Sequence, residues 1–170
     1  MQAIPFSKLA LASVAALFLV GCEMDSGGNG GFQRQYNSAR LALEEGKYDK
    51  ASRIYARLMD QAGPLRPRIQ LEYAHSELRA GNWANAAQLA ANLAQSQKDQ
   101  DRAAALSVLG TAQHEQGLAH LQNGENDAGK QMLQAADATL SDVLKSHPQM
   151  DPLGSLEGRR AAIRARLKRL

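Results

Sequence analysis

The sequence predicts an all-α protein made of about three helix pairs and a terminal helix. Three observations lead to this fold class. After Phe32, alanine, leucine, glutamine, glutamate and arginine dominate and β-branched residues are sparse, which favours helices. Apolar residues recur at i, i+3 and i+4, and no segment alternates as a strand does. A short pattern of small and aromatic residues also repeats along the chain, which is typical of stacked helical hairpins.

Residues 1–21 are predicted to be a signal peptide. Lys8 precedes an uncharged run from Leu9 to Val20, which is shorter than the roughly 20 residues of a bilayer span and suits a secretory hydrophobic region. The run ends in Leu-Val-Gly-Cys22, which resembles the bacterial lipobox, where the cysteine carries lipid. Cys22 is the chain's single cysteine, so an intrachain disulfide is impossible. An ordinary signal peptide with a chance cysteine, or a buried thiol, stays open as the alternative.

Lipid on Cys22 would anchor the mature chain without a membrane span. Residues 22–32 form a glycine-rich segment that we expect to be a flexible tether, holding a helical domain of residues 33–170 roughly 15–20 Å from the membrane. Glu23 is not the aspartate usually linked with inner-membrane retention. The lipobox resemblance therefore implies the periplasmic face of the bacterial outer membrane, and the inner membrane is less favoured.

The repeat is clearest at Gly46–Ala51 (GKYDKA) and Gly81–Ala86 (GNWANA), where an aromatic residue follows the glycine by two positions and an alanine follows it by five. Small residues let antiparallel helices approach closely, and a glycine with positive φ closes the first helix of each pair. The aromatic residue is expected to pack between the helices. Asp49 and Asn82 are expected to cap the second helices.

A third, longer copy aligns on Gly124, although Asn126 replaces its aromatic residue. The segment NGENDAGKQ also has the spacing of a phosphate-binding loop, G-x-x-x-x-G-K. Such a loop needs a strand before it and a Ser or Thr after Lys130, whereas helix-forming residues precede it and Gln131 follows. We therefore predict an inter-helix turn. The residues with a predicted role in turns and close packing are Ala39, Gly46, Tyr48, Ala51, Ala74, Gly81, Trp83, Ala86, Gly117, Gly124 and Gly129.

These copies resemble the tetratricopeptide repeat over roughly residues 33–146. The resemblance implies a helical-hairpin solenoid whose concave groove, lined by the first helix of each pair, binds another protein. Transferred position by position, the groove would contain Tyr36, Arg40, Arg68, Leu71, His75, Arg79, Thr111, His114 and Leu118. Arg40, Arg68 and Arg79 would then line one basic wall of the groove. Several of these side chains could equally face solvent without binding anything. The lysines and asparagines of chaperone-binding relatives are absent.

The last helix, about residues 153–170, places Leu156, Ile163, Leu167 and Leu170 on one stripe. Six basic and no acidic residues lie in 159–170, whereas residues 22–158 hold 13 basic and 17 acidic ones. A helix that covers the last pair is the favoured interpretation. The alternative is an amphipathic helix on anionic lipid or an acidic partner.

Catalysis, cofactors and nucleic-acid binding are not expected. The four histidines show no i, i+4 metal pair, and Asp99 and Asp101 are better explained as caps for a helix that begins near Arg102 than as calcium ligands. No interleaving of basic and aromatic residues suggests a nucleic-acid surface. No residue is therefore predicted to bind a metal ion.

Small lipoproteins with this predicted build resemble pilotin-like and Flp/Tad-type pilus assembly factors. That resemblance implies an assembly scaffold that binds a protein partner, such as a secretin or another pilus or secretion component. An adaptor in peptidoglycan or exopolysaccharide machinery is the alternative.

Overall fold

The computed structural model describes residues 29–170, which contain seven α-helices, two short 3₁₀ helices and no strand. The predicted signal peptide, Cys22, Glu23 and residues 22–28 of the predicted tether lie outside the described residues. The elements in order are α1 (Asn29–Glu44), α2 (Tyr48–Leu58), η1 (Gly63–Leu65), α3 (Arg66–Ala80), α4 (Trp83–Ser96), α5 (Asp99–Gln122), α6 (Asn126–Ser146), η2 (Pro148–Met150) and α7 (Ser155–Leu167).

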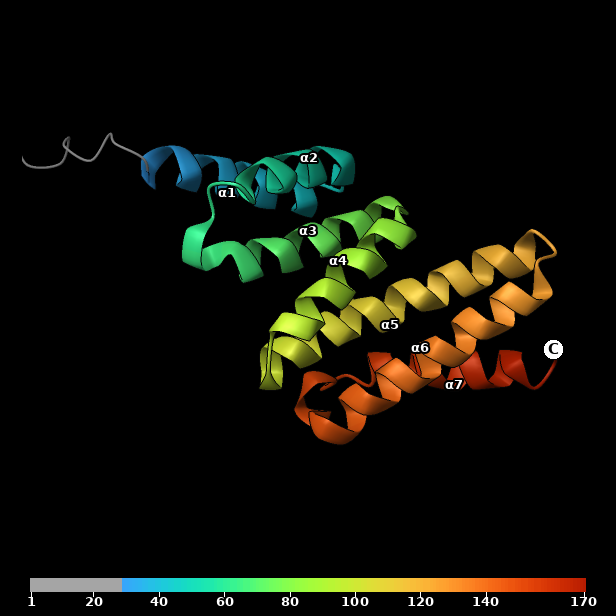
Figure 1. Cartoon of the computed structure of the whole chain (residues 1–170). Helices are drawn as coiled ribbons and strands as arrows, with labels where there is room; N and C mark the ends of the chain where they lie inside the picture. Colours follow the sequence, from blue (N-terminus) through green and yellow to red (C-terminus); the bar gives the residue numbers. More distant parts are fainter. Residues whose placement is uncertain (1–28) are drawn as a thin grey trace, which may run out of the picture.

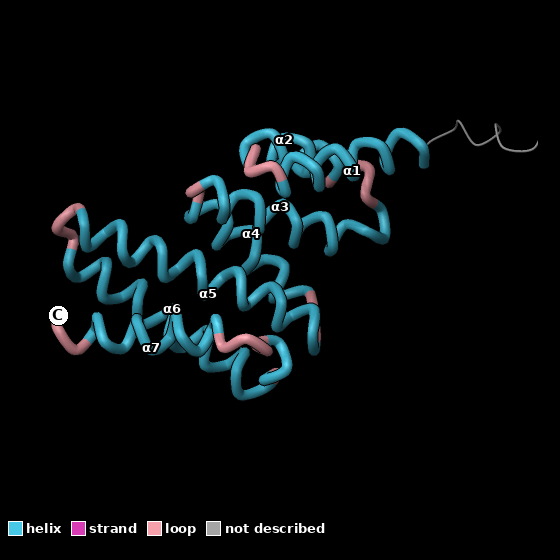
Figure 2. Tube along the Cα trace, turned by 180° about the vertical axis from the view of Figure 1, so that it is seen from behind, coloured by secondary structure: helices cyan, strands magenta, loops and turns pink. Residues whose placement is uncertain are grey.

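Each helix packs mainly against its neighbours in the sequence, from the α1–α2 pair at one end of the molecule to α7 at the other (Figure 1). The view from behind shows the same succession (Figure 2). Helices α3 and α5 also touch each other. The predicted all-α class is confirmed for the described residues.

The start of α1 corrects the predicted tether. Because α1 begins at Asn29, residues 29–32 of the 22–32 segment are helical. Phe32 packs against the buried cluster that α1 shares with α2 and α3. This burial offsets the low helix propensity of the preceding glycines, which composition alone could not show.

The predicted turn glycines are confirmed. Gly46, Gly81 and Gly124 have φ of +74°, +83° and +79°, a left-handed conformation that glycine adopts without steric cost. The segment NGENDAGKQ is the turn from α5 to α6 and the start of α6.

Of the predicted caps, only Asn82 has the expected position, and none makes a side-chain capping bond. Helix α2 begins at Tyr48, so Asp49 lies in its first turn, and Asn82 has the N-cap position of α4 without a side-chain capping bond. Helix α5 begins at Asp99 and includes Asp101, so these residues do not precede a helix near Arg102. The two aspartates still suit the first turn, where the helix dipole favours negative charge.

Close helix packing occurs at the predicted glycines of the α5–α6 pair. A Cβ atom on Gly129 would lie 2.6 Å from Leu121 Cδ2 and 3.0 Å from the Gly117 carbonyl oxygen. A Cβ on Gly117 would in turn lie 2.9 Å from Leu133 Cδ2. The two helices therefore meet with no room for a side chain at either position.

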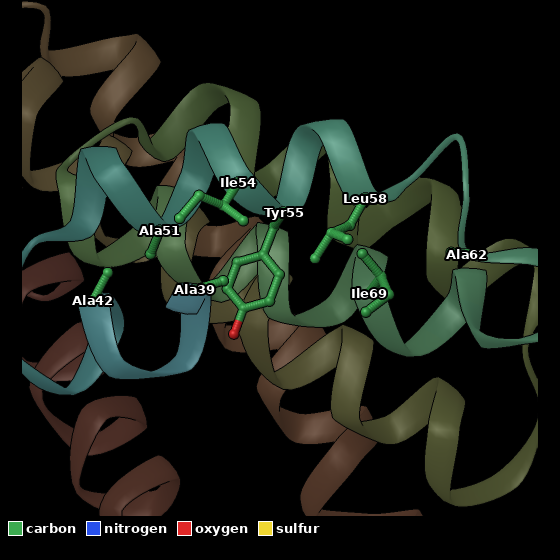
Figure 3. Close-up of a cluster of buried hydrophobic side chains, with 8 residues drawn as sticks. All are labelled: Ala39, Ala42, Ala51, Ile54, Tyr55, Leu58, Ala62 and Ile69. Carbon is green, nitrogen blue, oxygen red and sulfur yellow. The ribbon is translucent and has the colours of Figure 1, made fainter. Parts of the chain in front are cut away.

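The first core cluster joins α1, α2 and α3 and includes Ala62 of the connection between α2 and η1 (Figure 3). Its buried members are Ala39, Ala42, Ala51, Ile54, Tyr55, Leu58, Ala62 and Ile69. In the next pair Ala74 and Ala86 are also fully buried, as predicted. The small residues let the helices approach while Tyr55 and the aliphatic residues fill the space between them.

Helix α7 covers the α5–α6 pair. Ile163 is fully buried in a cluster with Leu133, Ala136 and Leu140, and Leu156 and Leu167 pack at its edge. The favoured interpretation of the last helix is therefore confirmed, except that Leu170 of the predicted stripe lies beyond α7 and is 48% exposed.

Candidate partner-binding cleft

An open cleft of about 560 Å³ lies where three helices meet. It is formed by η1 and the first turns of α3, the C-terminal end of α4, and the start of α5. Its lining residues are Pro64, Leu65, Pro67, Arg68, Leu71, Glu72, Leu93, Gln97 and Asp101, of which the first two belong to η1. We call this surface the η1 cleft.

Two prolines shape the rim of the η1 cleft. Pro64 and Pro67 are the second residues of η1 and α3, in the first turn, where a helix needs no backbone N–H and the proline ring fixes φ. Gly63 supplies the positive φ of +47° that starts the turn. This rigid connection leaves Leu65 52% exposed at the cleft rim. The GPLRP segment was the sequence signal for this feature, and the groove prediction did not use it.

The charges of the cleft are mixed rather than basic. Exposed Arg68 lies in the lining with Glu72 and Asp101. Glu72 accepts a hydrogen bond from Arg40 at 3.3 Å, and Arg40 also contacts Glu44 at 3.4 Å. Glu72 is the main reason that the pKa of Arg40 is raised. The predicted basic wall is therefore partly neutralised by its own acidic neighbours.

The predicted groove residues of α1 and α3 have different environments. Tyr36 packs edge-on against Tyr55, with ring centroids 6.3 Å apart, so it is part of the first core cluster. Leu71 is half-buried in the cleft lining. His75, one turn further along α3, is exposed, although the surrounding protein lowers the pKa of its imidazole.

Arg79 lies in a different cleft from Arg68. Its guanidinium donates a hydrogen bond to the Tyr48 hydroxyl at 2.5 Å and lies 4.9 Å from the centre of the ring. Both residues line a depression of about 350 Å³ at the start of α2. Arg68 and Arg79 therefore line different clefts, since α3 carries them at opposite ends.

Helix α7 contacts two of the three predicted groove residues of α5, His114 and Leu118. Arg159 of α7 donates to His114 Nδ1 at 2.6 Å and to Glu115 at 2.5 Å. Burial, reinforced by the Arg159 charge, lowers the pKa of His114. Leu118 packs against the cluster that contains Ile163, and the Thr111 hydroxyl donates to the Ser107 carbonyl. A groove that includes His114 and Leu118 would require α7 not to pack against them.

Within residues 29–170, no group of three or more His, Cys, Asp or Glu residues is placed to hold a metal ion. No helix in this part of the chain combines the length and apolar character needed to cross a bilayer. Comparison with protein-family models, curated proteins and solved structures finds no match to the chain.

Proposed function

We propose that the protein is a non-catalytic adaptor, anchored by lipid on Cys22 and facing the bacterial periplasm, that binds another protein through the η1 cleft. The observation that carries the proposal is the proline-framed rim, which holds Leu65 half-exposed beside Leu71 and Leu93. Exposed apolar residues next to polar groups are typical of protein-binding surfaces.

The side chains that line the cleft suggest what kind of partner segment would bind there. Leu65, Leu71 and Leu93 offer an apolar floor and rim, while Arg68 and Asp101 add one charge of each sign. A short helix or extended segment with an apolar anchor and flanking charges would fit this pattern. The tetratricopeptide-like interpretation of the hairpins supports such a role. A secretin or another component of a pilus or secretion machine remains the proposed partner class.

A first experiment tests the anchor. Cells expressing the chain are labelled with a palmitate analogue, and membranes are compared with those from a Cys22→Ala variant. We expect the label and the membrane association to be lost in the variant. If the variant is labelled and partitions as the parent does, lipid anchoring at Cys22 is wrong.

A second experiment tests the cleft by quantitative partner capture. Arg68→Glu should weaken capture by about tenfold or more, because breaking a desolvated charge pair at an interface costs about 2–5 kcal/mol. Arg68 is exposed and makes no ion pair within residues 29–170, so the thermal unfolding of the variant should change little. Arg166→Glu, which changes the charge equally at an exposed position of α7 that is also in no ion pair within residues 29–170, is the matched control and should capture normally.

A further inference from the structure

One face of α2 is an exposed row of cations. Lys50, Arg53 and Arg57 are all exposed and follow the i, i+3, i+7 spacing that places side chains on one face of a helix. The other face of α2 holds Tyr55 and Leu58, which are fully buried in the first core cluster. We call Lys50, Arg53 and Arg57 the α2 ridge.

Two more exposed arginines are held at the ends of α2. Arg79 stacks on Tyr48 at the N-terminal end. Arg66 donates a hydrogen bond to the carbonyl of Met59 just beyond the C-terminal end, at 3.1 Å. The positive surface therefore extends over the length of α2, which is about 16 Å for 11 residues at 1.5 Å each.

The cations of the α2 ridge are not held in ion pairs by the described residues. None of its three cations forms an ion pair within residues 29–170. The acidic residues close to it in the sequence are the exposed Glu44, Glu45, Asp49 and Asp60, and the charge of Lys50 contributes, after Lys47, to lowering the pKa of Glu45. On α7, by contrast, Arg160 and Arg164 both donate to Asp137, at 2.9 and 3.1 Å. The α2 ridge is thus available to an external anion.

The α2 ridge also lies at the end of the molecule where the described chain begins. Helices α1 and α2 form a hairpin, and Phe32 near the start of α1 packs in the same cluster as Leu58 near the end of α2. Figure 1 shows this pair at the end opposite α7. Cys22 precedes Asn29 by seven residues, a length of at most about 25 Å. A chain anchored at Cys22 would therefore hold the α1–α2 pair beside the bilayer.

We propose that the α2 ridge lies on anionic phospholipid headgroups of the membrane that holds Cys22; the orientation rests on the proposed lipid anchor. Cations within a Debye length of an anionic surface strengthen binding by about fivefold each. Arginine and lysine also donate charge-assisted hydrogen bonds to phosphate oxygens. The contact would fix α2 against the headgroups and direct α5, α6 and α7 away from the membrane.

Vesicle partitioning tests the α2 ridge separately from the anchor. The full chain carrying Cys22→Ser, which cannot be acylated at that position, is titrated with phosphatidylcholine vesicles and with vesicles that also contain phosphatidylglycerol. The ratio of the two partition coefficients reports the anionic contribution, since residues 1–28 are identical in every variant. The ridge variant is Lys50→Gln/Arg53→Gln/Arg57→Gln. The matched control, Arg166→Gln/Lys168→Gln/Arg169→Gln, removes the same charge at the opposite end.

We expect the ridge variant to lower the ratio by about tenfold or more and the control variant to change it less than about twofold. High salt should bring the ratio of the parent chain close to one but leave the ratio of the ridge variant almost unchanged. Equal losses in both variants, or a loss in the control alone, would overturn the proposal. An unchanged ratio combined with weaker partner capture by the ridge variant would assign the α2 ridge to an acidic protein segment instead. If palmitate labelling fails while the ratio behaves as expected, the anchor is wrong and the lipid affinity of the α2 ridge stands.

Discussion

Tyr55 shows how single residues determine the packing of the first hairpin. Its side chain is fully buried between α1 and α3, and its hydroxyl has no hydrogen-bond partner among the described residues. Burial raises the pKa of this hydroxyl well above its usual range, with a further contribution from the charge of Glu72. A buried, unpaired hydroxyl costs desolvation free energy, so the ring stabilises the fold and its oxygen opposes it.

Tyr55→Phe should therefore leave the free energy of unfolding unchanged or raise it by up to about 1 kcal/mol. Ser76→Ala is the contrasting variant, because buried Ser76 accepts a hydrogen bond from Ser52 at 2.9 Å and donates to the Tyr73 carbonyl. Removing Ser76 Oγ leaves the buried Ser52 hydroxyl without this acceptor and should cost about 1–3 kcal/mol. Urea unfolding measures both. A loss above about 1 kcal/mol for Tyr55→Phe would mean that the hydroxyl has a partner.

The glycine contacts of the α5–α6 pair give a second residue-scale prediction. Gly129→Ala should cost about 1–3 kcal/mol, because its Cβ would overlap Leu121 and approach the Gly117 carbonyl. Gly158→Ala on α7 is the matched control. A Cβ there meets nothing within 4 Å, so the change should stabilise the helix by about 0.5–1 kcal/mol. Equal effects of the two changes on thermal unfolding would show that helix propensity, not close approach, explains Gly129.

At this scale, the sequence predicted the residues that make local contacts. The small residues and turn glycines repeat at fixed distances from each other, so their roles could be inferred without coordinates. The Arg40–Glu72 ion pair joins residues 32 apart and depends on how α1 meets α3. The spacing of residues in the sequence does not reveal such a contact, so the predicted basic wall did not include Glu72.

Among the elements, α7 depends on a cap that lies before its first residue. Asp151 accepts hydrogen bonds from the backbone N–H groups of Leu156 and Glu157 at 3.0 and 2.9 Å, and from the Ser155 hydroxyl at 3.0 Å. Desolvation opposes ionisation of Asp151, but these hydrogen bonds outweigh it and lower its pKa. The cap joins α7 to the connection that follows α6.

Because the folded-state pKa of Asp151 lies below its unfolded value near 3.8, its stabilisation is complete above that value. It is lost as the pH falls through the folded-state pKa. Asp151→Ala should cost about 1 kcal/mol at neutral pH, as expected for a lost helix cap. Thermal unfolding from neutral to acidic pH should show the parent and variant converging at the acidic end. A constant difference across the range would mean that the carboxylate does not act as the cap. Asp60→Ala, an exposed carboxylate in a loop, should show no such convergence.

The packing role of α7 could be predicted from the sequence, whereas its contacts with α5 could not. Leu156, Ile163 and Leu167 formed a stripe that needed an apolar surface, and α5 and α6 supplied one. The same packing brings Arg159 to His114, so it removes His114 and Leu118 from the predicted groove. A transferred list of groove positions could not include this effect, since it depends on a helix outside the repeats.

At the scale of the whole molecule, the proposed anchor and the α2 ridge would orient the protein relative to the membrane and so position the η1 cleft. The succession of packed helices places the α1–α2 pair and α7 at opposite ends (Figure 1). If Cys22 and the α2 ridge both face lipid, the helices that follow extend into the periplasm with the η1 cleft between the two ends. The all-α class could be predicted from the sequence, but the position of the cleft depends on the Gly63–Leu65 connection between hairpins.

Site-specific photocrosslinking in intact cells tests the central claim, that the η1 cleft holds a partner protein. A photoreactive amino acid replaces Leu65, which is 52% exposed at the cleft rim, or Leu153, which is 93% exposed before α7. We expect one discrete protein adduct in the membrane fraction from position 65, no such adduct from position 153, and loss of the adduct when Arg68→Glu is added. An adduct from position 153 of equal yield, or an adduct from position 65 that survives Arg68→Glu, would contradict the account.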